Sequence, residues 1–160
     1  MAVETRRARE QDIPEIARLV AAISAYHEAL DDRARFDWDE IHRAPDWLPL
    51  LLGRDHHAIW VADAGPQLIG YLWVHLRRDR QGSLPRLRGY INHAFLEENW
   101  RGMGIMRPML EAAYQWFLSR DVTVVTLTVH HRNWLGSSAW YKLGFEDWTH
   151  ERRIVLKPRK

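Results

Sequence analysis

The sequence predicts a mixed α/β fold in which helices cover a central, mostly antiparallel sheet. Residues 57–62 and 68–76 alternate as two strands around a Gly-Pro turn, which is typical of a hairpin. Residues 13–30 have the apolar spacing of an amphipathic helix. Residues 90–117 combine a strand, a tight turn and a helix, and a strand at 122–130 follows them. That order implies one local parallel step through a right-handed crossover.

The N-terminal half begins with a candidate strand and a helix start signal. Residues 3–9 suit a first strand, and Asp12 is placed as the N-cap of the first helix. Glu15 follows at the three-residue spacing of a capping box. A polar segment, residues 31–46, then precedes a short second helix at 46–52.

The C-terminal half is also expected to contain both strands and helices. The elements predicted there are a loop at 79–89, strands at 90–96, 122–130 and 148–156, and helices at 105–118 and 133–142. The chain contains no internal repeat, low-complexity segment or linker, so residues 1–160 are expected to form a single domain.

Composition excludes several classes of function. A chain of 160 residues is large enough to bury roughly 70% of its unfolded surface. The absence of cysteine excludes disulfides, thiolate metal sites and a cysteine nucleophile. A formal charge of +2 with dispersed basic residues argues against nucleic-acid binding. No apolar run approaches a membrane span and the N-terminus is not signal-like, so a cytoplasmic location is the default expectation.

The junction after the strand at 90–96 is suited to anion binding. It has the sequence Arg-Gly-Met-Gly at residues 101–104, and Pro108 fits only the first turn of a helix, which places the helix start near Ile105. The first amides of a helix lack intrahelical partners and lie at its positive end. The N–H groups of residues 102–107 would therefore cradle a phosphate. The alternative is a tight turn that binds nothing.

Two motifs in this order resemble those of the GNAT superfamily of acyl-CoA-dependent N-acyltransferases. In that family a hydrophobic strand leads into Arg/Gln-x-x-Gly-x-Gly/Ala, which is present here from Arg101 to Met106. The later family pattern Asn-x-x-Ala-x-x-x-Tyr-x-Lys-x-Gly-Phe is matched in spacing by Asn133, Lys142, Gly144 and Phe145. The resemblance covers nearly the whole chain. It implies acetyl-CoA as cofactor and a sheet that splays at the strand before the phosphate turn.

The resemblance also assigns roles to particular residues. The expected cofactor-binding residues are Leu96, Glu97, Arg101, Gly102, Met103, Gly104, Ile105, Met106, Asn133 and Trp140. The first two would pair with the pantetheine arm through their main chains, and the turn would hold the pyrophosphate. Asn133 either contacts the cofactor or only caps a helix. Trp140 either walls the pantetheine channel or packs in the core.

Two positions depart from the family pattern. Met106 replaces a small residue, which is tolerable because main-chain amides make the contacts. Trp140 occupies the position of the family's tyrosine, and Tyr141 lies one residue later. An indole N–H only donates hydrogen bonds, and one helical step rotates a side chain by about 100°. Tyr141 is the candidate acid for the departing thiolate, but whether a general acid exists is left open.

Amine acylation also requires the acceptor to lose a proton. His93, on the strand before the phosphate turn, is the first candidate for the general base, since an ordinary histidine is mostly neutral at pH 7. The alternative is a hydrogen-bonded histidine on a sheet face. Asn92 is expected to point to the opposite face.

Other polar features favour no further site. The pairs His56-His57 and His130-His131 invite a metal interpretation, but adjacent strand residues face opposite sides, so no metal site is expected. The acidic segment at residues 31–46 is either a lid that favours cationic acceptors or a solvated loop.

The expected function is an N-acetyltransferase that moves the acetyl group of acetyl-CoA directly to a primary amine, on a small molecule or a protein. One alternative is a non-catalytic acyl-CoA-binding module, because the family tyrosine is missing. Another is an interaction domain that uses its nine tryptophans as a partner surface. A homodimer is possible by analogy alone. No nucleic-acid or membrane partner is expected.

Overall fold

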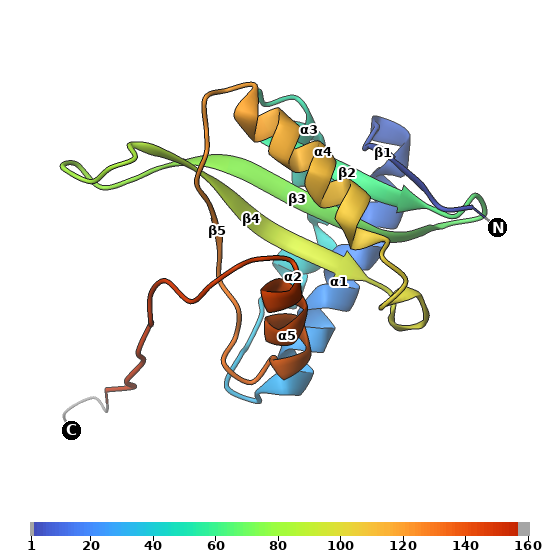
Figure 1. Ribbon diagram of the computed structural model, residues 1–160. Coiled ribbons are helices and arrows are strands. Elements are labelled where there is room, and N and C mark those ends of the chain that lie inside the picture. Colours follow the sequence, from blue (N-terminus) through green and yellow to red (C-terminus); the bar gives the residue numbers. More distant parts are fainter. Residues whose placement is uncertain (1, 157–160) are drawn as a thin grey trace.

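The computed structural model describes residues 2–156 and contains the elements shown in Figure 1. The strands are β1 (Glu4–Arg7), β2 (His57–Asp63), β3 (Leu68–Arg78), β4 (Leu87–Leu96) and β5 (Val125–Leu127). The helices are α1 (Ile13–Leu30), α2 (Trp38–His42), α3 (Ala44–Leu52), α4 (Met106–Leu118) and α5 (Trp134–Lys142), with short 3₁₀ helices η1 (Glu10–Asp12) and η2 (Glu98–Trp100).

The strands form one sheet in sequence order, β1-β2-β3-β4-β5. Neighbours from β1 to β4 are antiparallel, whereas β5 runs parallel to β4 after the crossover through α4. The predicted mixed, mostly antiparallel sheet with one parallel step is therefore confirmed. In Figure 1, α4 crosses one face of the sheet, and α1 and α3 lie on the other.

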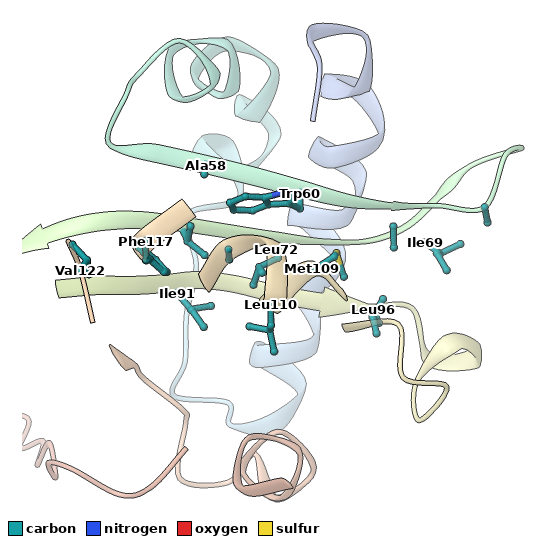
Figure 2. Close-up of a cluster of buried hydrophobic side chains, with 14 residues drawn as sticks. Ala58, Trp60, Ile69, Leu72, Ile91, Leu96, Met109, Leu110, Phe117 and Val122 are labelled. Carbon is teal, nitrogen blue, oxygen red and sulfur yellow. The ribbon is translucent and has the colours of Figure 1, made fainter. Parts of the chain in front are cut away.

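The core on the α4 side depends on a close approach between helix and sheet. Met109, Leu110 and Phe117 lie on one face of α4 and are almost completely buried against the strands, as Figure 2 shows. Full burial of each such side chain contributes about 1.5–3 kcal/mol. Phe117 lies directly over Gly89, where a Cβ atom would be 2.7 Å from its ring. Glycine at the start of β4 thus lets α4 settle onto the sheet.

The core on the opposite face joins α1 and α3 to the sheet. Ile16 and Leu19 of α1 are fully buried and belong to one cluster with Leu48 of α3. The sheet contributes Tyr71 and Phe95 to this cluster. Both faces of the sheet are thus covered, and β2 and β3 alternate between the two cores.

The pairing of β4 with β5 stops halfway along β4. Gly89 to Ile91 pair with Val125 to Leu127, and the register ends there. Residues 92–96 continue along β3, but within residues 2–156 no strand pairs with their outer edge. The expected splay at the strand before the turn is therefore confirmed, and it opens the sheet between β4 and β5.

Asp12 does not cap α1 in the predicted way. Its carboxylate makes no capping bond to the helix and instead accepts the Arg9 N–H at 2.7 Å. It also accepts two bonds from the Arg6 guanidinium, which bonds to Asp63 as well. The hydrogen bond from Arg6 lowers the pKa of Asp12. Asp12 therefore ties β1 and β2 to the start of α1.

Two other predictions about the N-terminal half and the centre need correction. The polar segment at residues 31–46 is not only a loop, because Asp37 accepts hydrogen bonds from Asp39 and Glu40 and caps α2. The predicted strand at 122–130 is reduced to β5. Val122 instead lies just after α4, where its N–H donates to the Phe117 carbonyl at 3.1 Å.

The predicted final strand at 148–156 is wrong. Residues 146–156 are exposed and without regular structure, and they extend away from the domain in Figure 1. The apolar side chains of Ile154 and Val155 are 81% and 71% exposed. A strand-like sequence forms a strand only where it has a neighbour to pair with, and this segment has none among the described residues. The structure of residues 157–160 lies outside the described range.

Within the described residues, no helix combines the length and the apolar composition that crossing a membrane requires.

Candidate functional site

The turn between β4 and α4 presents main-chain amides to open space. Gly102 and Gly104 have φ values of 76° and 78°, which glycine adopts without strain. A Cβ atom at either position would meet no atom within 4 Å. Within the described residues, the amides of residues 102–106 donate to no protein acceptor. Because they lie at the positive end of α4, their arrangement suits an anion.

The side chains of the turn leave this space free. Met106 is the first residue of α4, and its side chain packs against the core beneath the helix, as does that of Ile105. Met103 is 65% exposed. The methionine at the position of a small family residue therefore does not obstruct the amides. A neighbouring cavity of about 350 Å³ lies between this turn and β1.

The Arg101 side chain is held by the protein rather than directed at the turn. Its Nε donates to the Leu96 carbonyl at 2.9 Å, and its guanidinium lies over the rings of Tyr26 and Phe95, 5.2 and 5.7 Å from their centroids. This residue therefore fixes the end of β4 relative to α1. Its main-chain N–H is also engaged, because it donates to the Glu98 carbonyl at 3.2 Å, so the expected contact of Arg101 with an anion is not supported through either group.

The two residues expected at the open edge of β4 are not equivalent. The Glu97 N–H donates to the Ile69 carbonyl at 2.9 Å, so it faces β3, and the Glu97 carboxylate accepts from Arg18 at 2.6 Å. Main-chain groups of a strand alternate in direction, so Leu96 faces the open edge. The expected pairing of the Glu97 amide with a ligand is therefore not supported. The Leu96 contact stays a prediction, and the Leu96 carbonyl already accepts one hydrogen bond, from Arg101 Nε.

A bulge in β4 changes the direction of its polar side chains. The β3–β4 register shifts between Trp73 and Val74, which leaves Asn92 as an extra residue in β4. The Asn92 amide lies 2.7 Å from His75 Nδ1, on the sheet face that also carries His93. The expectation that Asn92 points to the opposite face from His93 is therefore wrong, because a bulge interrupts the alternation.

His93 is fixed by a buried tyrosine. Tyr71 is completely buried, and its hydroxyl lies 2.6 Å from His93 Nδ1. Within the described residues this nitrogen is the hydroxyl's sole partner, so the O–H donates to Nδ1 and the neutral ring carries its proton on Nε2. Burial, with a smaller effect from His27, lowers the pKa of His93 to about 4.

This geometry does not favour the expected role of His93 as a general base. A ring with Nδ1 occupied and Nε2 protonated has no free lone pair with which to accept a proton from an amine. Its pKa of about 4 also lies well below the ordinary value assumed from the sequence. His93 is instead a neutral group with one N–H to donate.

A cavity of about 280 Å³ opens beside His93 on the α1 side of the sheet. Its other lining residues are Val20, Glu40, Ile41, Trp47, Leu51 and Trp73. They come from α1, α2, α3 and β3, so with His93 of β4 the cavity lies where five elements meet. It adjoins the bulge of β4, which is where β4 parts from β5.

Asn133 is the N-cap of α5. Its Oδ1 accepts the Gly136 N–H at 2.9 Å and the Tyr26 hydroxyl at 2.9 Å. The structure therefore shows the helix-cap alternative for Asn133 Oδ1. Its second hydrogen bond, from Tyr26 of α1, also connects the start of α5 to α1. The cofactor contact stays a prediction that involves the Asn133 amide nitrogen.

The two aromatic residues near the end of α5 do not meet His93. Trp140 packs edge-on against Phe145, with centroids 5.1 Å apart, and against the α4-side core, so its core-packing alternative is observed. Tyr141 is 55% exposed and donates its hydroxyl to Asp147 at 2.9 Å, which raises the pKa of Tyr141. It is absent from the cavity lining, so the structure does not support Tyr141 as the catalytic acid.

One group of side chains has metal-ligand spacing. Single ligand atoms of Asp31, His130 and His131 lie within 4.8 Å of one another. These two histidines lie in a turn, with ring centroids 4.7 Å apart, so the argument from strand alternation does not apply to them. Asp31, however, is already paired with Arg33 at 2.7 Å and Arg132 at 3.7 Å. The absence of a metal site stays a prediction.

Sequence reasoning missed most of the residues around His93. Tyr71 and Trp73 have the same parity on the strand at 68–76, so a strand assignment places them on one face. Their pairing with His93 depends on the β3–β4 register, which the sequence does not reveal. Glu40 and Trp47 reach the cavity from helices whose packing is likewise unreadable from the sequence.

Several solved structures have the same fold as this chain. A tetramutant of the BH1408 protein from Bacillus halodurans superposes with a TM-score of 0.81 at 23% identity, covering 96% of this chain and 99% of that one. A predicted acetyltransferase from Clostridium acetobutylicum, crystallised with acetyl-CoA, gives 0.75 at 19% identity and 97% coverage of both chains. The aminoglycoside 6'-N-acetyltransferase AAC(6')-Ih from Acinetobacter baumannii gives 0.72 at 16% identity and 99% coverage of both.

These identities are low, so the structural matches establish the fold alone. No curated protein sequence gives a significant match to the chain. The sequence model of the acetyltransferase (GNAT) family, however, matches residues 18–145, which include the glycine turn at residues 101–104, the bulged strand and the whole of α5. The chain therefore belongs to the GNAT acetyltransferase family.

Proposed function

We propose that this protein is an N-acetyltransferase that transfers the acetyl group of acetyl-CoA directly to the primary amine of a small molecule. The observation that carries the proposal is the row of unpartnered amides at residues 102–106, beside an unpaired strand edge that leads to a cavity. Family membership and the neighbours crystallised with acetyl-CoA or with a CoA bisubstrate analogue support it.

Acetyl-CoA fits the groups that the chain offers. The amides of residues 102–106 take the diphosphate, and each negative charge near a helix terminus gains about 0.3–1 kcal/mol, or up to ~2 when partly buried. The Leu96 main chain pairs with the amide-bearing arm along the open edge of β4. The amide nitrogen of Asn133, the N-cap residue of α5, is proposed as a further contact. Acetyl-CoA supplies the activated thioester, and the chain holds it in place.

His93 acts as a hydrogen-bond donor in this proposal. Tyr71 occupies Nδ1 and keeps the proton on Nε2, and the low pKa of His93, about 4, keeps the ring neutral. A neutral N–H beside the reacting centre can stabilise negative charge that develops on a carbonyl oxygen. The side chain is held by burial and by one hydrogen bond, so this donor is already in position before the reaction.

The acceptor proton leaves without a histidine base. Deprotonating an amine of pKa 10.4 costs ~4.6 kcal/mol at pH 7, and an amine near pKa 8 costs about 1.4 kcal/mol. The cavity has one carboxylate in its wall, that of Glu40, which is 56% exposed. In the proposed reaction the amine proton passes to water at the cavity mouth, so the rate follows the fraction of neutral amine. The new N–C bond forms as the C–S bond of the thioester breaks, and CoA leaves as a thiolate that water protonates, since a thiol of pKa ~8.5 needs no dedicated acid.

The rival is a non-catalytic acyl-CoA-binding module. It is favoured by Trp140 in the position of the family tyrosine and by Tyr141, which is bonded to Asp147 outside the cavity. Thermal stabilisation by acetyl-CoA and amine-dependent release of CoA, measured together on the intact protein, separate the enzyme from the module. Acetyl-CoA at 100 times its dissociation constant should stabilise the fold by ~2.7 kcal/mol in either case. Release of free CoA that depends on added amine supports the enzyme, and stabilisation without release supports the module.

A further inference from the structure

The cavity beside His93 also specifies the kind of amine, an inference that rests on the proposed acetyl transfer. We infer that the acceptor is a primary monoamine carried on a single aromatic ring or on an apolar body of similar size. Its apolar body lies against Trp47 and Trp73, and its nitrogen lies near His93. Glu40 at the cavity wall favours entry of its cation.

The first support is a continuous aromatic surface that leads to His93. The rings of Trp47 and Trp73 have centroids 6.0 Å apart, and Trp73 lies 5.0 Å from the His93 ring. Both indole N–H groups already donate to protein acceptors. That of Trp73 donates to His57 Nδ1 at 3.1 Å, and that of Trp47 donates to the Glu40 carbonyl at 3.4 Å. The two tryptophans therefore offer ring surface to a ligand rather than hydrogen bonds.

The remaining wall is apolar and the space is small. Apart from Glu40, the other lining residues are Val20, Ile41 and Leu51, and none of these three carries a side-chain hydrogen-bonding group. A volume of about 280 Å³ is near the lower end of the range for small-molecule sites, roughly 300–1,000 Å³. A polyhydroxylated, many-ringed acceptor would leave its hydroxyl groups unpaired against this wall, whereas one ring and a short linker match it.

The charges around the cavity suit a single cation. Among residues 2–156, Glu40 is the one acidic residue that lines the cavity, and no lysine or arginine of this range lines it. Burial lowers the pKa of both His57 and His93 to about 4, so these rings are neutral at pH 7 and do not repel an ammonium group. Indole faces attract a cation. Glu40 already pairs with Arg43 at 3.4 Å, so the wall has little negative charge to offer an acceptor that carries several cations.

The test compares three acceptors on the full-length protein with acetyl-CoA: 2-phenylethylamine, 2-methoxyethylamine and the aminoglycoside sisomicin. The wild type should acetylate 2-phenylethylamine with a kcat/KM at least about tenfold above either polar amine, because burying the phenyl group adds to binding. Trp47→Ala should raise the KM for 2-phenylethylamine by about tenfold and leave that for 2-methoxyethylamine nearly unchanged. Trp148→Ala, at a 74% exposed tryptophan outside the cavity, is the matched control and should change neither.

A second variant tests the charge without removing a ring. Glu40→Gln should raise the KM for 2-phenylethylamine two- to fivefold, since the carboxylate is partly exposed, and should not change inhibition by the uncharged 2-phenylethanol. Sisomicin or 2-methoxyethylamine as the better substrate, or equal effects of Trp47→Ala on all amines, would overturn the inference and leave acetyl transfer intact. Binding of acetyl-CoA without turnover of any amine would overturn the proposed function as well.

Discussion

Replacing His93 by glutamine separates a hydrogen-bond donor from a general base. The Gln Nε2 group can donate in place of the imidazole Nε2–H, but an amide cannot take up a proton. Loss of one donor to a developing oxyanion lowers turnover about 10²–10³-fold, or about 2.7–4 kcal/mol. We therefore expect His93→Ala to lose that factor and His93→Gln to keep turnover within about tenfold of the wild type. Initial rates of thiol release at saturating acetyl-CoA measure both variants.

CoA affinity serves as the control for these two variants, and the pH profile gives an outcome that would refute the donor role. Because His93 lies within β4 and the proposed diphosphate contacts lie in the later turn at residues 102–106, both variants should keep the wild-type affinity for CoA, measured by calorimetry. The pKa of His93, about 4, also predicts that kcat/KM shows no break near pH 6.5 and follows the neutral fraction of the amine. Equal losses in His93→Ala and His93→Gln, together with such a break, would restore the general base and refute the donor.

Two further predictions concern stability. Gly89→Ala should lower the free energy of unfolding by about 1–3 kcal/mol, because its Cβ would lie 2.7 Å from the Phe117 ring. Gly53→Ala is the control, because its Cβ would lie 3.8 Å from its nearest neighbour, and it should change the free energy of unfolding by less than about 0.5 kcal/mol. Urea denaturation measures both variants, and equal effects of the two substitutions would contradict this packing. Since Arg6 lowers the pKa of Asp12, this carboxylate stabilises the fold above its unfolded pKa of about 3.9, and the gain is lost as pH falls through the folded pKa. The stability difference between wild type and Asp12→Asn should therefore narrow below about pH 4, and a constant difference would contradict the role of the ion pair.

The parts of the fold that local chemistry determines were predictable. The start of α4 follows from Pro108 and the glycines before it, and the hairpin between β2 and β3 follows from alternation and a Gly-Pro turn. The final strand was not predictable in the same way. Residues 148–156 have the apolar alternation of a strand, but a strand also needs a neighbour, and alternation does not reveal whether the chain supplies one.

The site shows the same division between local and non-local information. The amides at residues 102–106 are a local property of a glycine turn before a helix, and the sequence located them. The tautomer and pKa of His93 depend on Tyr71, 22 residues away, and on the register of two strands. The bulge at Asn92 reverses the face that simple alternation assigns to it. Chemistry that depends on strand register required the three-dimensional structure.

The central claim is that main-chain amides at the start of α4 hold a diphosphate. A titration of ¹⁵N-labelled protein with CoA, followed by amide NMR, tests it directly, with pantetheine as the ligand that lacks the diphosphate. CoA should shift the amide signals of Gly102 and Gly104 strongly, and pantetheine should not. The amides of Gly65 and Gly82, which also have positive φ values but lie in other turns, should not move with either ligand. Binding of CoA with the Gly102 and Gly104 signals unmoved would contradict the claim.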